Sequence, residues 1–210
     1  MNQTSSLTQE AVWLEAVSGN RIDLEHPDPG SIRLNDIATG LSRIPLYLGQ
    51  TVQKEPYPVA MRGIWIAKYL CATQGNTGLA LLGILTDAHK AYTGECPAPL
   101  RRVPWINQQL ESIEHRLQAA ILTALDAPAL TVAACRLIAE AKDQARAIEA
   151  QHLMPSQGRD WNMECITPEA QAIGFTQPIQ GDILCANFQH EMRDIDFGRT
   201  FQLTLLAVEA

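Results

Sequence analysis

The chain has 210 residues, of which 46% are hydrophobic and 19% are charged. This length is enough for one well-buried domain, and the composition excludes disordered and collagen-like chains. Sixteen Lys and Arg residues against 23 Asp and Glu residues give a formal net charge of -7. Because that sign is wrong for a protein that coats nucleic acid or an anionic membrane, positive charge is expected only in a local pocket.

The N-terminus and the cysteines bear on location. The first ten residues, MNQTSSLTQE, lack the positive and apolar regions of a signal peptide, and the longest aliphatic run, LALLGIL, is too short to span a bilayer. The chain has five widely separated cysteines and no CxxC pair: Cys71, Cys96, Cys135, Cys165 and Cys185. We therefore expect a cytoplasmic protein with buried free thiols and no membrane contact.

The first half of the chain predicts a loop and then helices. Residues 19–31 combine Gly, Pro, Asn and Asp, which indicates an ordered loop. Asn35 or Asp36 is expected to cap the short helix that follows. Apolar spacing predicts helices over residues 59–73 and 77–92, and the second is so apolar that we place it in the core.

The middle of the chain predicts a loop and two longer helices. Three prolines between residues 97 and 104 interrupt regular structure. Helical periodicity then runs through residues 106–125 and 130–152, and the second stretch is rich in strong helix formers. We expect no strand before Met154.

The last 55 residues have a different character. Residues 201–205 alternate apolar and polar side chains, and residues 183–188 form a second candidate strand. A short C-terminal β-hairpin is one interpretation, although a short apolar run is equally compatible with a helix. We divide the chain into a helical core at 1–155 and an extension at 156–210 that packs on the core or on a partner.

Four blocks follow one another along the chain: RIDLEHPDPGSIRLNDIATGLSRIPLYLGQT (21–51), YPVAMRGIWIAKYL (57–70), ALLGILTDAHKAYTGECPAPLRR (80–102) and AEAKDQARAIEAQHLMP (139–155). In order and spacing they resemble the small HD-domain metal-dependent phosphohydrolases of bacteria and phages, which include 5'-deoxynucleotidases. The resemblance implies a mainly α fold, an HD-domain-like helical bundle. In that family two histidines and two aspartates hold a divalent metal, which lowers the pKa of bound water and neutralises charge on phosphate.

The chain departs from the family pattern at nearly every metal-ligand position. Arg62 stands where the resemblance implies a histidine, and the His-Asp pair is replaced by Thr86 and Asp87. The second aspartate falls on Lys142. With three of four ligands replaced, we expect no catalytic residue, no metal and no cofactor.

The surrounding polar positions have changed as well. By the same resemblance, Gln50 replaces a histidine, Lys90 replaces an acidic residue and Glu95 conservatively replaces an aspartate. Leu46 stands where the family tends to show an arginine. The candidate ligand-binding pocket therefore comprises Arg62, Asp87, Lys90, Lys142, Gln50, Thr86 and Glu95.

Three cations now occupy the positions that would surround a metal. Our first hypothesis is a catalytically inactive HD-fold protein in which Arg62, Lys90 and Lys142 bind a phosphate-bearing, nucleotide-like ligand, to sequester or sense it. The structural alternative is that Arg62 or Lys142 only neutralises Asp87, because an unpaired buried carboxylate is costly. We also predict that Asp87 is buried and within salt-bridge reach of Arg62 or Lys142.

Two further functions remain open. One is a protein-interaction or assembly module that binds a partner, or a second copy, through the C-terminal extension. The other is a divergent metal-dependent nucleotide phosphohydrolase, which a family resemblance alone would suggest but which the absent ligands disfavour. Nucleic acid is not an expected partner.

Overall fold

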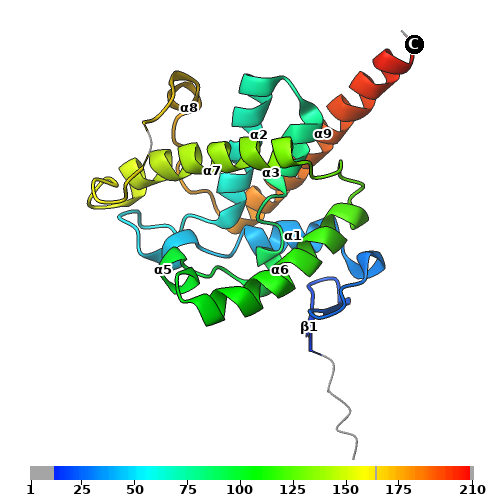
Figure 1. Cartoon of the computed structure of the whole chain (residues 1–210), viewed down its shortest axis with the longest axis horizontal. Coiled ribbons are helices and arrows are strands. Elements are labelled where there is room, and N and C mark those ends of the chain that lie inside the picture. The colour runs from blue at the N-terminus through cyan, green and yellow to red at the C-terminus, as the bar shows by residue number, and fades with distance from the viewer. Residues whose placement is uncertain (1–11, 164, 209–210) are drawn as a thin grey trace, which may run out of the picture.

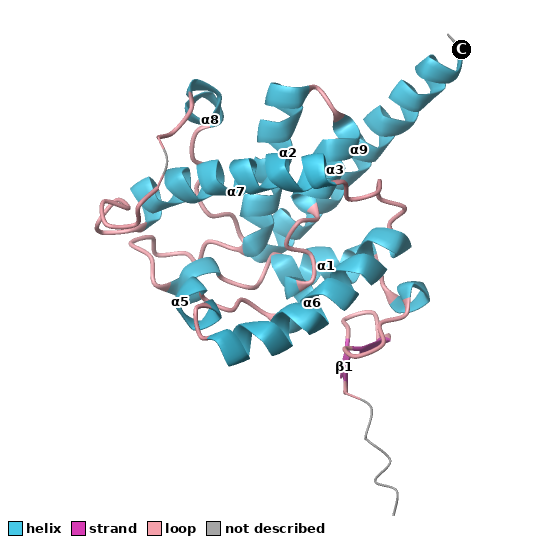
Figure 2. Ribbon diagram, in the orientation of Figure 1, coloured by secondary structure: helices cyan, strands magenta, loops and turns pink. Residues whose placement is uncertain are grey.

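The computed structural model describes the backbone of residues 12–163 and 165–208, and the side chains of these residues except 197 and 200–208. Within that range the protein is mainly α-helical, as predicted, with one small sheet near the N-terminus (Figure 1, Figure 2). No helix in this part of the chain combines the length and apolar character needed to cross a membrane.

The small sheet is an antiparallel pair of three-residue strands, β1 (Trp13–Glu15) and β2 (Arg21–Asp23). The expectation of no strand before Met154 was therefore wrong. Strands this short show too little alternation to be recognised in the sequence. The connecting turn uses Gly19, whose φ of 83° lies in the left-handed region that glycine tolerates.

The first helix is α1 (Leu34–Leu41), and neither Asn35 nor Asp36 caps it. Arg33 is the N-cap residue, and its side chain makes no capping hydrogen bond. Asp36 is instead buried within the helix, where its carboxylate accepts hydrogen bonds from the Ser18 backbone N–H at 3.0 Å and the Ser18 hydroxyl at 2.7 Å. The aspartate therefore joins the helix to the β-hairpin turn.

The core is built around α2 (Val59–Gln74) and α3 (Thr77–Ile84). Gly63 lets the two approach, because a Cβ there would lie 2.8 Å from the Ile84 carbonyl oxygen. The long helix predicted over residues 77–92 is interrupted: the chain leaves α3 after Ile84, turns through residues 85–89 and continues as α4 (Lys90–Thr93). This turn carries Asp87 into the interior.

The remaining helices of the predicted core follow in order. α5 (Ala98–Arg101) is a single helical turn within the expected proline loop, whereas α6 (Pro104–Ala124) and α7 (Val132–Leu153) confirm the two predicted longer helices. Two 3-10 turns also occur, η1 (Pro29–Ser31) and η2 (Leu46–Gly49).

The C-terminal extension contains helices, so the predicted β-hairpin was wrong. α8 (Pro168–Ile173) is followed by the long α9 (Gly181–Val208). Leu184, Phe188 and Ile195 of α9 are buried in the same cluster as residues of α1, α2 and α3. Their spacing of four and seven residues is helical, and burial on the core favours that period over the alternation at residues 201–205. Figure 1 shows the C-terminal end of α9 extending away from the body.

The cysteines are free, but the prediction that they are buried was wrong. Cys71, Cys135 and Cys165 are exposed, and Cys96 and Cys185 are half-buried. The sequence pattern did not reveal this, because an isolated cysteine in a helix gives no signal of which face it occupies.

Candidate functional site

Five segments bring the predicted charged residues together. α2 supplies Arg62, the turn after α3 supplies Asp87, α4 begins at Lys90, and α7 supplies Lys142. The loop that follows α4 supplies Glu95. We call these five residues, together with Glu149 and Tyr47 described below, the ion cluster.

Asp87 lies at the centre of the ion cluster and is only 5% exposed. Lys142 Nζ lies 2.8 Å from Asp87 Oδ1, and Lys90 Nζ lies 3.2 Å from Asp87 Oδ2. The prediction that Asp87 is buried and paired with Arg62 or Lys142 is thereby confirmed, with Lys142 as the direct partner. Lys90 is also shared, because its Nζ lies 2.6 Å from Glu95 Oε2.

The charge state of Asp87 follows from these contacts. Burial by itself raises the pKa of a carboxyl group, because it disfavours the charged form. Here the nearby charges of Lys142, Lys90 and Arg62 outweigh burial and hold the pKa of Asp87 well below its ordinary value of 3.8. Asp87 is therefore an ionised carboxylate with a cation on each oxygen.

Arg62 makes its closest contacts with a different carboxylate. Its Nε donates to Glu149 Oε1 at 2.9 Å and its Nη2 contacts Glu149 Oε2 as well, so the pair is bidentate. The Tyr47 hydroxyl donates to Glu149 Oε2 at 2.6 Å and accepts from Arg62 Nη2 at 3.0 Å. Burial lowers the pKa of Arg62, but Glu149 more than offsets it, so that pKa rises above its ordinary value.

Glu149 and Tyr47 are site residues that the sequence analysis missed. Glu149 follows Lys142 by seven residues, which places both on one face of α7. That spacing could have shown that Glu149 faces the same interior as Lys142. Tyr47 gave no such signal, because it lies in the η2 turn with a positive φ of 56°.

The cluster is electrically balanced. It contains three cations, Arg62, Lys90 and Lys142, and three carboxylates, on Asp87, Glu95 and Glu149. The formal charges therefore sum to zero, and each cation has a carboxylate within salt-bridge distance. Burial of such a group is tolerable because every charge is paired.

A cavity of about 240 Å³ borders the cluster on the α7 side. Thr86 and Lys142 line it together with Gln118, and the remaining lining is mostly aliphatic. The Lys142 side chain is 39% exposed, compared with 9% for Lys90. Neither Arg62 nor Lys90 lines this cavity, and a single cavity bounded by all three cations stays a prediction.

Gln50 is the sequence-predicted residue that stands apart. It is exposed at the end of η2, and its side chain forms no hydrogen bond with the other candidate residues in the described part of the chain. The loop after residue 49 thus holds it outside the cluster.

The residues present do not fit the metal that the family resemblance implies. Arg62 and Lys142 carry positive charge where neutral or anionic ligands would be needed, and Thr86 is a poor ligand for a divalent transition metal. The one retained aspartate already has both oxygens on ammonium groups. In the described part of the chain no group of three or more His, Cys, Asp or Glu side chains is arranged to hold a metal ion.

Comparison with known proteins adds one relative. No protein-family model matches the chain. The chain is similar to an uncharacterized protein of Rhodobacter capsulatus, with 28% identity over 146 residues, which cover 67% of this chain and 72% of the relative. This similarity assigns no activity, and the HD-domain resemblance stays a prediction.

Proposed function

We propose that this chain is a non-catalytic protein on an HD-domain-like helical core, which acts by binding rather than by hydrolysis. The observation that carries the proposal is the pairing of Asp87 with two ammonium groups, Lys142 at 2.8 Å and Lys90 at 3.2 Å. Internal cations thereby balance the carboxylate that a metal would otherwise neutralise. An ammonium group cannot lower the pKa of water as a divalent metal does, so the cluster lacks a means to generate hydroxide.

The ligand that the proposal favours at this site is a phosphate-bearing small molecule. The cavity beside the cluster offers the Lys142 ammonium and the Thr86 hydroxyl as donors and an aliphatic wall for an uncharged body, such as a base. Because Asp87 already neutralises much of the Lys142 charge, we expect weak binding that depends on the whole ligand rather than on phosphate alone.

A hydrolysis assay tests the non-catalytic part of the proposal. Purified protein is titrated with Mn²⁺ or Co²⁺ and given each deoxynucleoside monophosphate, and released phosphate is measured. We expect no release above that of the Asp87→Ala variant, together with no stoichiometric metal by elemental analysis. Metal-dependent release that Asp87→Ala abolishes would show a working phosphohydrolase instead.

A thermal-shift screen over nucleotides and cyclic nucleotides tests the ligand. A ligand at one hundred times its dissociation constant stabilises the fold by about 2.7 kcal/mol, which is a measurable rise in Tm. Lys142→Gln should reduce the ligand-dependent part of that rise. Arg146→Gln is the matched control, because Arg146 lies one turn further along α7 and is half-exposed. An equal ligand-dependent shift in Lys142→Gln and wild type would place the ligand elsewhere.

A second candidate function is assembly through α9, and one observation favours it. The C-terminal end of this helix extends away from the body (Figure 1), and its last eight residues, FQLTLLAV, are mostly apolar in sequence. Light scattering after size exclusion compares the full chain with a chain ending at residue 199. This truncation keeps the buried Leu184, Phe188 and Ile195. A lower mass per particle in the truncated chain supports assembly, and an unchanged monomer contradicts it.

We also propose a cytoplasmic location. The described part of the chain contains five free cysteines, three of them exposed, and exposed free thiols persist best in a reducing compartment. Fractionation of the source cells followed by immunodetection tests this, and recovery from a secreted or envelope fraction would contradict it.

A further inference from the structure

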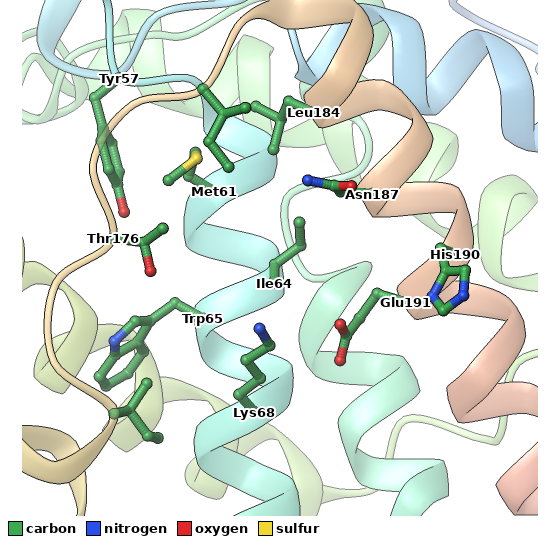
Figure 3. A pocket seen from close by; sticks show the side chains of 12 residues that line it. Tyr57, Met61, Ile64, Trp65, Lys68, Thr176, Leu184, Asn187, His190 and Glu191 are labelled. Carbon is green, nitrogen blue, oxygen red and sulfur yellow. The ribbon is translucent and has the colours of Figure 1, made fainter.

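A second cavity, distinct from the one that borders the ion cluster, lies between α2, the connector after α8, and α9 (Figure 3). Its volume is about 260 Å³, slightly below the range of about 300–1,000 Å³ that is typical for drug-sized ligands. Met61, Ile64 and Trp65 of α2 form one wall, and Leu184 of α9 forms the other. These apolar side chains share the lining with polar ones, among them Thr176, Asn187 and His190, and the volume suits a small molecule.

The side chain of Tyr57 is buried in the protein, and its hydroxyl group opens on this cavity. Tyr57 is only 2% exposed, and its ring stacks on Phe175 with centroids 5.5 Å apart. Its hydroxyl makes no hydrogen bond with any described residue, although Tyr57 lines the cavity. Figure 3 shows the hydroxyl end of the ring directed down between α2 and the connector, on the side of Thr176.

The Tyr57 hydroxyl can donate a hydrogen bond to an acceptor in the cavity. Burial raises the pKa of Tyr57 well above its ordinary value, so the group stays protonated and can donate. Because no described residue accepts a hydrogen bond from it, this hydroxyl is available to donate to a molecule in the cavity.

Two opposite charges lie at the solvent-facing rim of the cavity, where Lys68 is exposed and Glu191 is half-buried. Lys68 lies one helical turn after Ile64 on α2, and Glu191 comes from α9. Neither makes an ion pair or hydrogen bond with a described residue, and no ion pair joins them. Figure 3 shows Lys68 lying along α2 and Glu191 on the side of α9 that faces α2.

The order of these groups along α2 gives the shape of the ligand. Tyr57 precedes the first residue of α2, whereas Lys68 lies nine residues after Val59. At a rise of about 1.5 Å per residue, the two positions are separated by roughly 13 Å or more along the helix axis. A ligand that satisfies both ends therefore needs a charged head, an apolar middle and a distal acceptor.

We propose that this cavity binds a small aromatic zwitterion, such as a free amino acid with a phenol-like side chain. Lys68 pairs with its carboxylate, Glu191 with its ammonium group, and the Tyr57 hydroxyl donates to its distal oxygen. Trp65 and Met61 provide the apolar contact for the ring.

The test uses four probes of nearly equal size and the full chain. L-tyrosine has all three groups; L-phenylalanine lacks the distal oxygen, tyramine lacks the carboxylate and 3-(4-hydroxyphenyl)propionate lacks the ammonium group. Isothermal titration calorimetry should rank L-tyrosine first, with phenylalanine at least threefold weaker and the two singly charged probes about tenfold weaker. Failure of all four probes to bind at millimolar concentration would overturn the proposal.

Variants assign each preference to one residue. Tyr57→Phe should abolish the preference for tyrosine over phenylalanine, Lys68→Gln the preference over tyramine, and Glu191→Gln the preference over the propionate. Exposed Lys54→Gln is the control and should leave all four affinities unchanged. If Tyr57→Phe unfolds, Lys68→Gln and Glu191→Gln still test the proposal, because neither substitution removes an ion pair or hydrogen bond within the described part of the protein. Unchanged preferences in those two variants would refute the assigned contacts.

Discussion

Replacement of Lys90 by methionine is the sharpest test of the ion cluster. Lys90 is 9% exposed, and its ammonium group lies within 3.2 Å of Asp87 and 2.6 Å of Glu95. Methionine keeps most of the side-chain volume and removes the charge. Asp87 then keeps only Lys142 as a directly bonded cation, and Glu95 loses the ion pair.

The expected loss is large because both carboxylates are buried. Removal of one partner from a buried ion pair costs about 3–5 kcal/mol, and the low exposure of Lys90 leaves little water to compensate. For a chain of about 200 residues this corresponds to a fall in Tm of roughly 6–20 °C. Urea unfolding followed by circular dichroism would measure the same difference at constant temperature.

The pH dependence identifies the cause of the loss. Lys90 is one of the cations that hold the pKa of Asp87 low, so without Lys90 the pKa of Asp87 should rise, and protonation of Asp87 should relieve its lost pairing as the pH falls. The difference in unfolding free energy between Lys90→Met and wild type should therefore become smaller below about pH 4 to 5. Lys54→Met, at an exposed lysine, should change stability by no more than about 0.5 kcal/mol. A loss of stability below about 1 kcal/mol for Lys90→Met would show that Lys90 does not form the described ion pairs with Asp87 and Glu95.

Three further outcomes are expected. Lys142→Asp should destabilise the fold by about 2–3 kcal/mol, which is less than the loss expected at a fully buried ion pair because the Lys142 side chain is 39% exposed. Lys142→Arg should be nearly neutral, and equal Tm values for the two variants would contradict this prediction. Because the pKa of Asp87 in the folded protein lies below 3.8, its ionised form stabilises the fold above about pH 4, and this contribution is lost as the pH falls toward the folded pKa. The free energy of unfolding, measured between about pH 2.5 and 6, should therefore depend less steeply on pH in Asp87→Asn than in wild type. Gly63→Ala should cost about 1–3 kcal/mol, because the new Cβ would lie 2.8 Å from the Ile84 carbonyl oxygen, and unchanged thermal unfolding would show that α2 and α3 can separate at no cost.

Much of the helical framework was predictable from local pattern. In α2, α6 and α7 the helical periodicity of the apolar residues continues over enough residues to identify a helix without tertiary information. The burial and pairing of Asp87 were also predicted, because the family resemblance placed this carboxylate in a buried site where it would need a cation nearby. Sequence order and charge thus indicated the helical class and the need for an ion pair.

Tertiary structure decided which groups pair and where short elements form. Arg62 binds Glu149 and Tyr47, although Asp87 seemed the natural partner, because α2 and α7 pack so that Glu149 lies within 2.9 Å of the guanidinium group. The extension is helical because Leu184 and Phe188 find a buried surface on the core. Side-chain pairing depends on distances between segments that lie far apart in the chain, and a period along one segment carries no information about those distances.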